Sequence, residues 1–253
     1  MARQGEVSDA GLLRLLWSPE RPTGPRPGPK SQLTMEAIVR AGVAVADDRA
    51  GPPLSMRLVA DRLGRTPMAL YSYVDGKDTL LRLMYDAAHA EFAPPDGADA
   101  VEGVQVWATA LTDLYASHHW LADLSWSRPV LGPHEQEVLE SLLRRLGPFA
   151  LTSTQDGTVA SALLTLCRST GRLIADARHA ERATGMSDEQ WWRAQSTEMA
   201  ELAPDFADRF PLSARTGSAV PDDDPSQGYV ERSARAQLNR TVRFLLDGAK
   251  ADH

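Results

Sequence analysis

The sequence has little cysteine, no long apolar run and no overall excess of positive charge. Its single cysteine, Cys167, cannot form an internal disulfide bond or a multi-cysteine zinc site, so packing alone must hold the fold. No apolar stretch reaches the roughly 18–20 residues needed to cross a bilayer. The first residues lack the apolar segment and small-residue cleavage site of a signal peptide. We therefore expect a cytoplasmic protein with no membrane partner.

The common catalytic motifs are also missing. The chain contains no glycine-rich phosphate loop, no His-Glu-x-x-His and no Gly-x-Ser-x-Gly. Cys167 sits in an apolar helical run, which favours an inert core thiol over a nucleophile. We expect no catalytic residues, no cofactor and no metal. An all-α enzyme with a hidden carboxylate site and a helical adaptor that binds protein are the alternatives.

The charge distribution changes the meaning of the net charge. The chain of 253 residues carries −7, which by itself argues against binding to nucleic acid. From Arg21 to Lys77, however, there are nine Lys and Arg residues and five Asp and Glu residues, so this segment has a net charge of +4 and the remainder of the chain −11. A basic front end on an acidic body suits a protein that touches DNA with one end only.

The N-terminal extension combines a short apolar helix with a proline-rich segment. Residues 5–17 favour a helix, whereas residues 18–32 hold five prolines together with Arg21, Arg26 and Lys30. No helix survives that density of proline, so this segment is an extended arm. It is either a plain linker or a basic arm that follows phosphates or enters a minor groove.

The periodicity of the remaining chain is helical, and no stretch shows sustained strand alternation. Side-chain caps for the N-terminal helices are predicted at Thr34, Ser55, Thr66 and Asp75. Gly64 is expected to end the second of these helices, and Gly248 the last helix of the chain. Further on, helices are predicted at 100–119, 122–128, 133–147, 154–183, 187–203 and 229–247, with a turn-rich loop at 213–228.

Residues 54–81 read as helix, tight turn, short helix, turn and helix. In a helix-turn-helix the second helix enters the major groove and its N-terminal residues meet the bases. Positive, hydroxyl and small apolar side chains at the matching positions suit phosphates and thymine methyl groups. The predicted DNA contacts are Arg57, Arg65, Thr66, Pro67, Met68, Tyr71, Ser72, Tyr73 and Lys77. Few of these make bidentate hydrogen bonds to a base, so indirect readout is another route to specificity.

The same run resembles the DNA-binding motif of the TetR family. The matching points are Arg62-Leu63-Gly64, the aromatic residues Tyr71 and Tyr73, and the Gly76-Lys77 step before an apolar helix. The Leu-Leu-Trp segment and proline-basic arm that precede it resemble a subgroup common in actinomycetes. From residue 100 onward the layout is similar to the tetracycline-repressor type of C-terminal domain.

This resemblance implies an all-α protein with a three-helix DNA-binding domain, a connecting helix and a larger helical ligand-binding and dimerisation domain. The corresponding map is 1–32 for the extension, 33–76 for the helix-turn-helix domain and 77–253 for the remainder. It implies a homodimer that binds a palindromic double-stranded DNA operator and is released by a small apolar or aromatic effector. In the family, two helices like 154–183 and 229–247 pair with their symmetry mates; repression is the family's usual mode.

The effector site is expected in the aromatic C-terminal half. Aromatic walls suit a flat apolar ligand, and the wall candidates are Trp107, Leu111, His118 and Trp126. His118 and His119 diverge by about 100° on a helix, so both cannot easily bind one metal ion. Alignment on Arg128-Pro129 places Leu124 where tetracycline repressors hold the histidine for a magnesium–drug complex. This departure argues against tetracycline–magnesium recognition.

Overall fold

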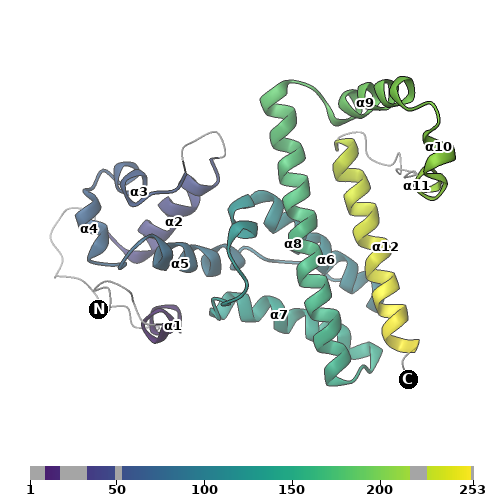
Figure 1. The fold of residues 1–253 in the computed structure, drawn as a ribbon. Coiled ribbons are helices and arrows are strands. Elements are labelled where there is room, and N and C mark those ends of the chain that lie inside the picture. Colours follow the sequence, from purple (N-terminus) through teal and green to yellow (C-terminus); the bar gives the residue numbers. More distant parts are fainter. Residues whose placement is uncertain (1–8, 18–32, 49–52, 217–226, 252–253) are drawn as a thin grey trace, which may run out of the picture. The chain divides into compact units, whose positions relative to one another are not determined.

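The computed structural model describes residues 9–17, 33–48, 53–216 and 227–251 of the chain (Figure 1). All regular structure in these ranges is helical, which confirms the predicted all-α fold. No helix in the described ranges is long and apolar enough to span a membrane. The proline-basic arm predicted at 18–32 lies outside the described residues.

The chain divides into two compact units. The first unit consists of Met1–Pro94 and Ser117–Gly147, and the second of Pro95–Ala116 and Pro148–His253. The chain therefore passes between the units three times rather than once. The predicted functional boundary at residues 76 and 77 remains a prediction, because this division follows contacts within each unit.

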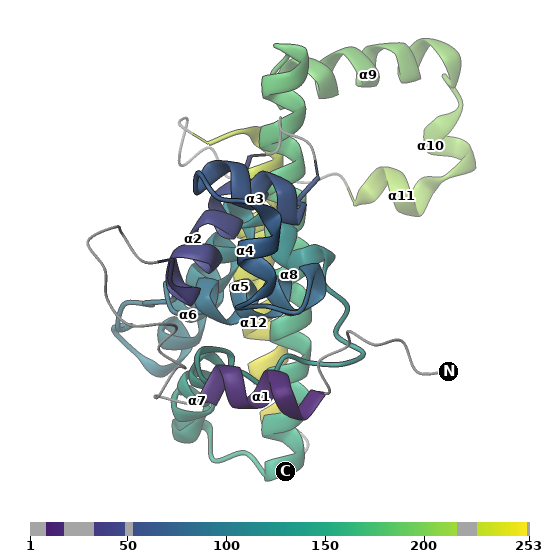
Figure 2. The same cartoon turned by 90° about the vertical axis from the view of Figure 1, so that its left-hand side faces the viewer.

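The first unit contains α1 (Asp9–Trp17), α2 (Met35–Ala46), α3 (Met56–Arg62), α4 (Pro67–Tyr71), α5 (Lys77–His89), η1 (His119–Asp123) and α7 (Pro133–Leu146). Figure 2 shows α2 to α5 gathered in one group. Helix α2 packs against α3 and α5, and α3 packs against α4. Ile38, Val59, Leu70 and Leu80 are fully buried in this group, so burial of apolar side chains holds the short helices in place.

Three of the four predicted N-cap positions are confirmed, and two of these residues also make a side-chain cap hydrogen bond. The hydroxyl of Thr34 accepts from the backbone N–H of Ala37, and that of Ser55 from Leu58. Thr66 occupies the N-cap of α4 without a side-chain cap hydrogen bond, because Pro67 at the first position already sets the backbone. The N-cap of α5 is Gly76, not Asp75 as predicted, and no side chain caps this helix.

Within the first unit, helix α7 is held to α5 by a buried carboxylate. Oδ1 of Asp86 on α5 accepts from the backbone N–H groups of His134 (3.0 Å) and Glu135 (3.1 Å). These are orphan donors at the N-terminus of α7, so Asp86 acts as its cap from another helix. The indole of Trp17 on α1 donates to the carbonyl of Leu131 just before α7.

The second unit contains α6 (Ala100–Ser117), α8 (Ser153–Thr184), α9 (Asp188–Leu202), α10 (Phe206–Arg209), α11 (Pro211–Arg215) and α12 (Tyr229–Ala251), with η2 (Gly147–Phe149) at its border. Helices α8 and α12 lie side by side in opposite directions (Figure 1). Glu231 on α12 is bound by Arg178 of α8 and by Arg235, which also binds Asp113 of α6. This network joins the three helices.

Helices α9, α10 and α11 bury no side chain. Helix α9 is tied to α12 where Arg232 binds Glu189 at 2.9 Å and where the rings of Trp192 and Tyr229 lie 6.3 Å apart. The large apolar side chains that remain exposed include Trp191, Trp192, Leu202 and Leu212.

Two further helix predictions were wrong. No α-helix forms at 122–128; the chain makes η1 and then a turn at Trp126 and Ser127. The hydroxyl of Ser125 accepts from the backbone N–H of Ser127, and Pro129 disfavours a helical Arg128, so both local chemistries oppose a helix. Helix α12 continues through Gly248 to Ala251 rather than ending there.

Candidate nucleic-acid interface and effector site

The turn between α3 and α4 has the geometry that a helix-turn-helix requires. Leu63 is the C-cap of α3, and Gly64 follows with φ +62°, a left-handed conformation that glycine adopts without strain. The N–H of Arg65 donates to the carbonyl of Ala60, and that of Gly64 to Asp61. This pattern is a Schellman motif, which ends one helix tightly enough for Thr66 to begin the next.

Helix α4 is anchored on one side and open on the other. Leu70 has no exposed surface and Val74 only 1%, so both fasten the helix to the core. Met68, by contrast, is 77% exposed and Tyr71 45% exposed. Met68 and Tyr71 stand three residues apart on one helix, so together they form an apolar surface that a partner can contact.

All nine predicted DNA contacts lie at the surface of the first unit. Arg57, Arg65, Thr66, Met68, Tyr71, Ser72 and Lys77 are exposed, and Pro67 and Tyr73 are partly exposed. Arg57 is 85% exposed and makes a 3.9 Å ion pair with Asp61. An ion pair this open contributes little to stability, so Arg57 is available to another anion. The hydroxyl of Ser72 donates to the carbonyl of Ala69, which leaves its oxygen as an acceptor.

Lys77 stands at the first position of α5, after an N-cap that contributes no side chain. The exposed ammonium group and the positive end of the helix point to the same chemistry, which is the binding of an anion. Arg62 is exposed at the end of α3 as well. Arg62 is not among the nine predicted contacts, although its charge and its place beside the turn were signals visible in the sequence.

The four predicted effector residues fall in different units. Trp107 and Leu111 of α6 are fully buried in the second unit. Close to them the Cys167 thiol donates to the carbonyl of Ala108. Burial raises the pKa of this thiol to about 12, in keeping with the inert cysteine that the sequence predicts. His118 and Trp126 belong to the first unit.

Trp126 lines a pocket of about 310 Å³ within the first unit. Helix α5 contributes Leu81, Arg82 and Tyr85 to its wall, and the loop after η1 contributes Leu124 and the segment from Ser125 to Val130. Its lining does not include Trp107, Leu111 or His118. The α5 residues were missed because their approach to residues 124–130 depends on tertiary packing. The assignment of all four predicted residues to an effector stays a prediction.

His118 is engaged on both ring nitrogens. Nδ1 lies 2.8 Å from Oδ1 of Asp47, and Nε2 lies 3.1 Å from Oε2 of Glu91. The indole of Trp120 donates to the same Asp47 oxygen at 2.8 Å. Only the carbon edges and faces of the imidazole are left for any other contact.

Comparison with known proteins identifies the family. Residues 93–226 match the family model described as tetracyclin repressor-like, C-terminal domain. Over 223 residues the chain is 36% identical to the HTH-type transcriptional repressor DrrR1 of Streptomyces coeruleorubidus, a match that covers 83% of this chain and 77% of the relative. The chain belongs to the TetR family. TetR proteins are transcription regulators, so the enzyme and adaptor alternatives are set aside.

Solved structures share the TetR fold. A TetR regulator from Streptomyces coelicolor has a TM-score of 0.64 at 26% identity and covers 87% of this chain and 99% of its own. The same organism's ActR, in its apo form, has a TM-score of 0.64 at 20% identity over 88% of this chain and all of its own. ActR in complex with actinorhodin matches with a TM-score of 0.63 at 20% identity, covering 88% of this chain and 98% of its own. This TetR chain is a transcriptional regulator with the fold of these structures.

Proposed function

We propose that this chain is a homodimeric repressor that grips a palindromic operator with α3 and α4 and releases it when a small apolar or aromatic effector binds. The observation that carries the proposal is the solvent-facing side of α4. Met68 and Tyr71 stand exposed while Leu70 between them is fully buried. A short helix held this firmly by its inner face can present its outer face to a major groove.

The surface around α4 supplies the phosphate contacts. Arg57 near the start of α3, Arg65 in the turn and Lys77 at the start of α5 surround the recognition helix in sequence. Their charges would fix the position of the protein on the duplex, while Thr66, Pro67 and Met68 would meet base edges and thymine methyl groups. The hydroxyls of Tyr71, Ser72 and Tyr73 add further phosphate contacts.

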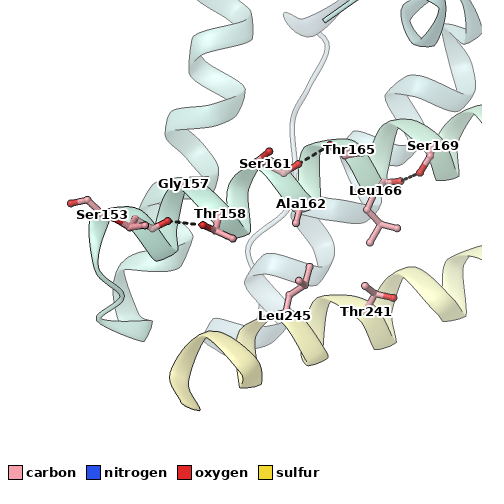
Figure 3. A pocket seen from close by; sticks show the side chains of 11 residues that line it. Ser153, Gly157, Thr158, Ser161, Ala162, Thr165, Leu166, Ser169, Thr241 and Leu245 are labelled. Carbon is pink, nitrogen blue, oxygen red and sulfur yellow. Dashed lines mark hydrogen bonds between the residues drawn. The ribbon is translucent and has the colours of Figure 1, made fainter. Parts of the chain in front are cut away.

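The dimer is proposed to form through α8 and α12. An open pocket of about 840 Å³ lies along these helices, with small side chains such as Gly157, Ser161 and Ser169 on α8. Figure 3 shows Ala162 and Leu166 of α8 pointing toward α12, where Leu245 and Thr241 face them. Small residues let two helix pairs approach closely. Leu173, four residues beyond Ser169, is 50% exposed, and Phe244 beside Leu245 is 73% exposed.

The effector is proposed to bind within the first unit, in the pocket of about 310 Å³ that the predicted residue Trp126 lines. Trp126 offers an aromatic surface in the pocket beside Tyr85. The fold is one for which a small-molecule complex is known, that of ActR with actinorhodin. An effector that prefers the conformation with low DNA affinity lowers operator binding, and by linkage the operator lowers effector binding equally.

Hydroxyl-radical footprinting on the DNA upstream of the chain's own gene tests the proposal. A dimer that reads a palindrome should protect two symmetric half-sites about 34 Å apart along the helix axis. Met68→Ala should weaken this protection, because the side chain that meets the bases is gone, while a Leu212→Ala change on α11 should not. Protection of a single unsymmetrical stretch would rule out the palindrome, and no protection of any upstream duplex would rule out the operator at that place.

A further inference from the structure

The three points where the chain passes between the two units are Pro94–Pro95, Ala116–Ser117 and Gly147–Pro148. Glu91 lies three residues before the first of these points. At the second point Ser117 is the first residue that belongs to the first unit again, and His118 follows it directly. Both residues belong to the first unit. A conformational change of the second unit that is transmitted through the backbone at these two points therefore acts first on the segments that hold Glu91 and His118.

Glu91 and His118 are bound to each other and to a DNA-binding helix. His118 is 7% exposed, and its ring lies between the carboxylates of Asp47 (2.8 Å) and Glu91 (3.1 Å). A carboxylate only accepts, so donation to both of them requires a proton on each ring nitrogen and a positive charge on the ring. Trp120 donates to the same oxygen of Asp47 and completes the cluster.

Asp47 connects the cluster to the operator-binding helices. It is the C-cap of α2, and its backbone N–H donates to the carbonyl of Val43. Helix α2 packs against both α3 and α5. A positive group beside the C-terminal end of α2 also suits the helix dipole. The buried imidazolium of His118 thus connects the C-terminal end of α2 to the segments next to two of the three points where the chain passes between the units.

We propose that His118 is a positioning residue that couples the two units, holding α2 and α5 in the arrangement that binds the operator through its bonds to Asp47 and Glu91. This rests on the proposed function, because its effect is measured at the operator. A cluster that fixes the helix ends in advance reduces the ordering cost of DNA binding. When the cluster opens, operator affinity falls.

The coupling depends on pH. The hydrogen bond that His118 donates to Asp47 raises the pKa of His118 most, burial opposes this, and the bond to Glu91 raises the pKa further. The other titratable side chain that interacts with the ring is His89 of α5, whose pKa burial lowers to about 4, so it stays neutral. Because the folded pKa lies above the ordinary 6.5, the contribution of the cluster is complete below that value and is lost as pH rises through the raised pKa.

The test compares wild type, His118→Gln and the control His134→Gln, whose parent side chain is 41% exposed in the same unit. Each is titrated with a labelled duplex from upstream of its own gene at about pH 6 and about pH 8.5, on either side of an ordinary histidine pKa. At the lower pH His118→Gln should bind about tenfold more weakly, the size of one lost charge-assisted hydrogen bond. The difference should shrink as the pH rises, and the control should follow wild type throughout.

A second readout needs no DNA. Amide hydrogen exchange of the free protein should rise in His118→Gln at the C-terminal end of α2, in the first unit, and in the last turn of α6 up to Ala116, in the second unit. If wild type binds no upstream duplex, the proposed function fails, and exchange alone decides the coupling. Equal affinity of His118→Gln and wild type at low pH, or faster exchange confined to the first unit, would overturn the inference. Should His118→Gln not fold, Glu91→Gln removes only the more exposed of the two carboxylates and is held to the same results.

Discussion

Arg57 offers the sharpest prediction at the scale of one residue. It is 85% exposed and pairs with Asp61 one turn away, and Arg144 on α7 is its match, 69% exposed and paired with Glu140. Arg57→Ala should weaken operator binding at low salt and reduce the slope of log Kd against log salt by about one, because one phosphate contact is lost. Arg144→Ala should change neither. An equal loss in both variants would mean that net charge, not the contact at Arg57, sets the affinity.

The sequence predicts surface residues of this kind better than buried polar clusters. The nine expected DNA contacts follow from position along a helix-turn-helix, and all nine lie at the surface. The bonds of His118 to Asp47 and Glu91 join positions 71 and 27 residues apart. No local pattern reports such distances along the chain, so a histidine that looked like a wall for an apolar ligand proved to be held by two carboxylates.

At the scale of the element, Gly171 sets the approach of α8 to α6. A Cβ there would lie 2.5 Å from Cβ of Tyr115 and 2.7 Å from the carbonyl oxygen of Thr112. These atoms are backbone or close to it, so they cannot move aside cheaply. Gly171→Ala should lower the free energy of unfolding by about 1–3 kcal/mol, measured by urea denaturation. Gly248→Ala, where a Cβ meets nothing within 4 Å, should be neutral or slightly stabilising; a loss there equal to that at Gly171 would contradict the account.

Helices could be predicted wherever periodicity and caps agreed. The caps at Thr34 and Ser55 and the glycine turn at Gly64 were all visible in the sequence. Prediction failed at 122–128, where hydrogen bonding by Ser125 and the proline at 129 compete with the helix, and at Asp75, where Gly76 takes the cap position.

At the scale of the whole molecule, the proposed dimer depends on exposed apolar side chains of α8 and α12. Phe244 is 73% exposed, and Leu212 on α11 matches it at 73%. Phe244→Glu should raise the Kd of the dimer at least about tenfold, because burial of an unpaired charge costs more than the free energy of a tenfold change in Kd. Sedimentation equilibrium measures this Kd. Leu212→Glu should remain dimeric. A Phe244→Glu protein that still sediments as a tight dimer would place the interface elsewhere.

The division of the chain into two units lay beyond the sequence. Residues 117–147 return to the first unit after α6 has begun the second, and this return depends on contacts such as those of Asp86 with the start of α7. Composition and periodicity indicate helices but not which helix each one packs against.

The most direct test of the account is a titration of the purified protein against its own upstream DNA at two salt concentrations, with a scrambled duplex as control. The account predicts tight binding to the upstream duplex that weakens steeply with salt, and binding to the scrambled duplex that is at least about a thousandfold weaker. Equal affinity for both duplexes, or an affinity that does not change with salt, would contradict a protein that reads an operator through α3 and α4.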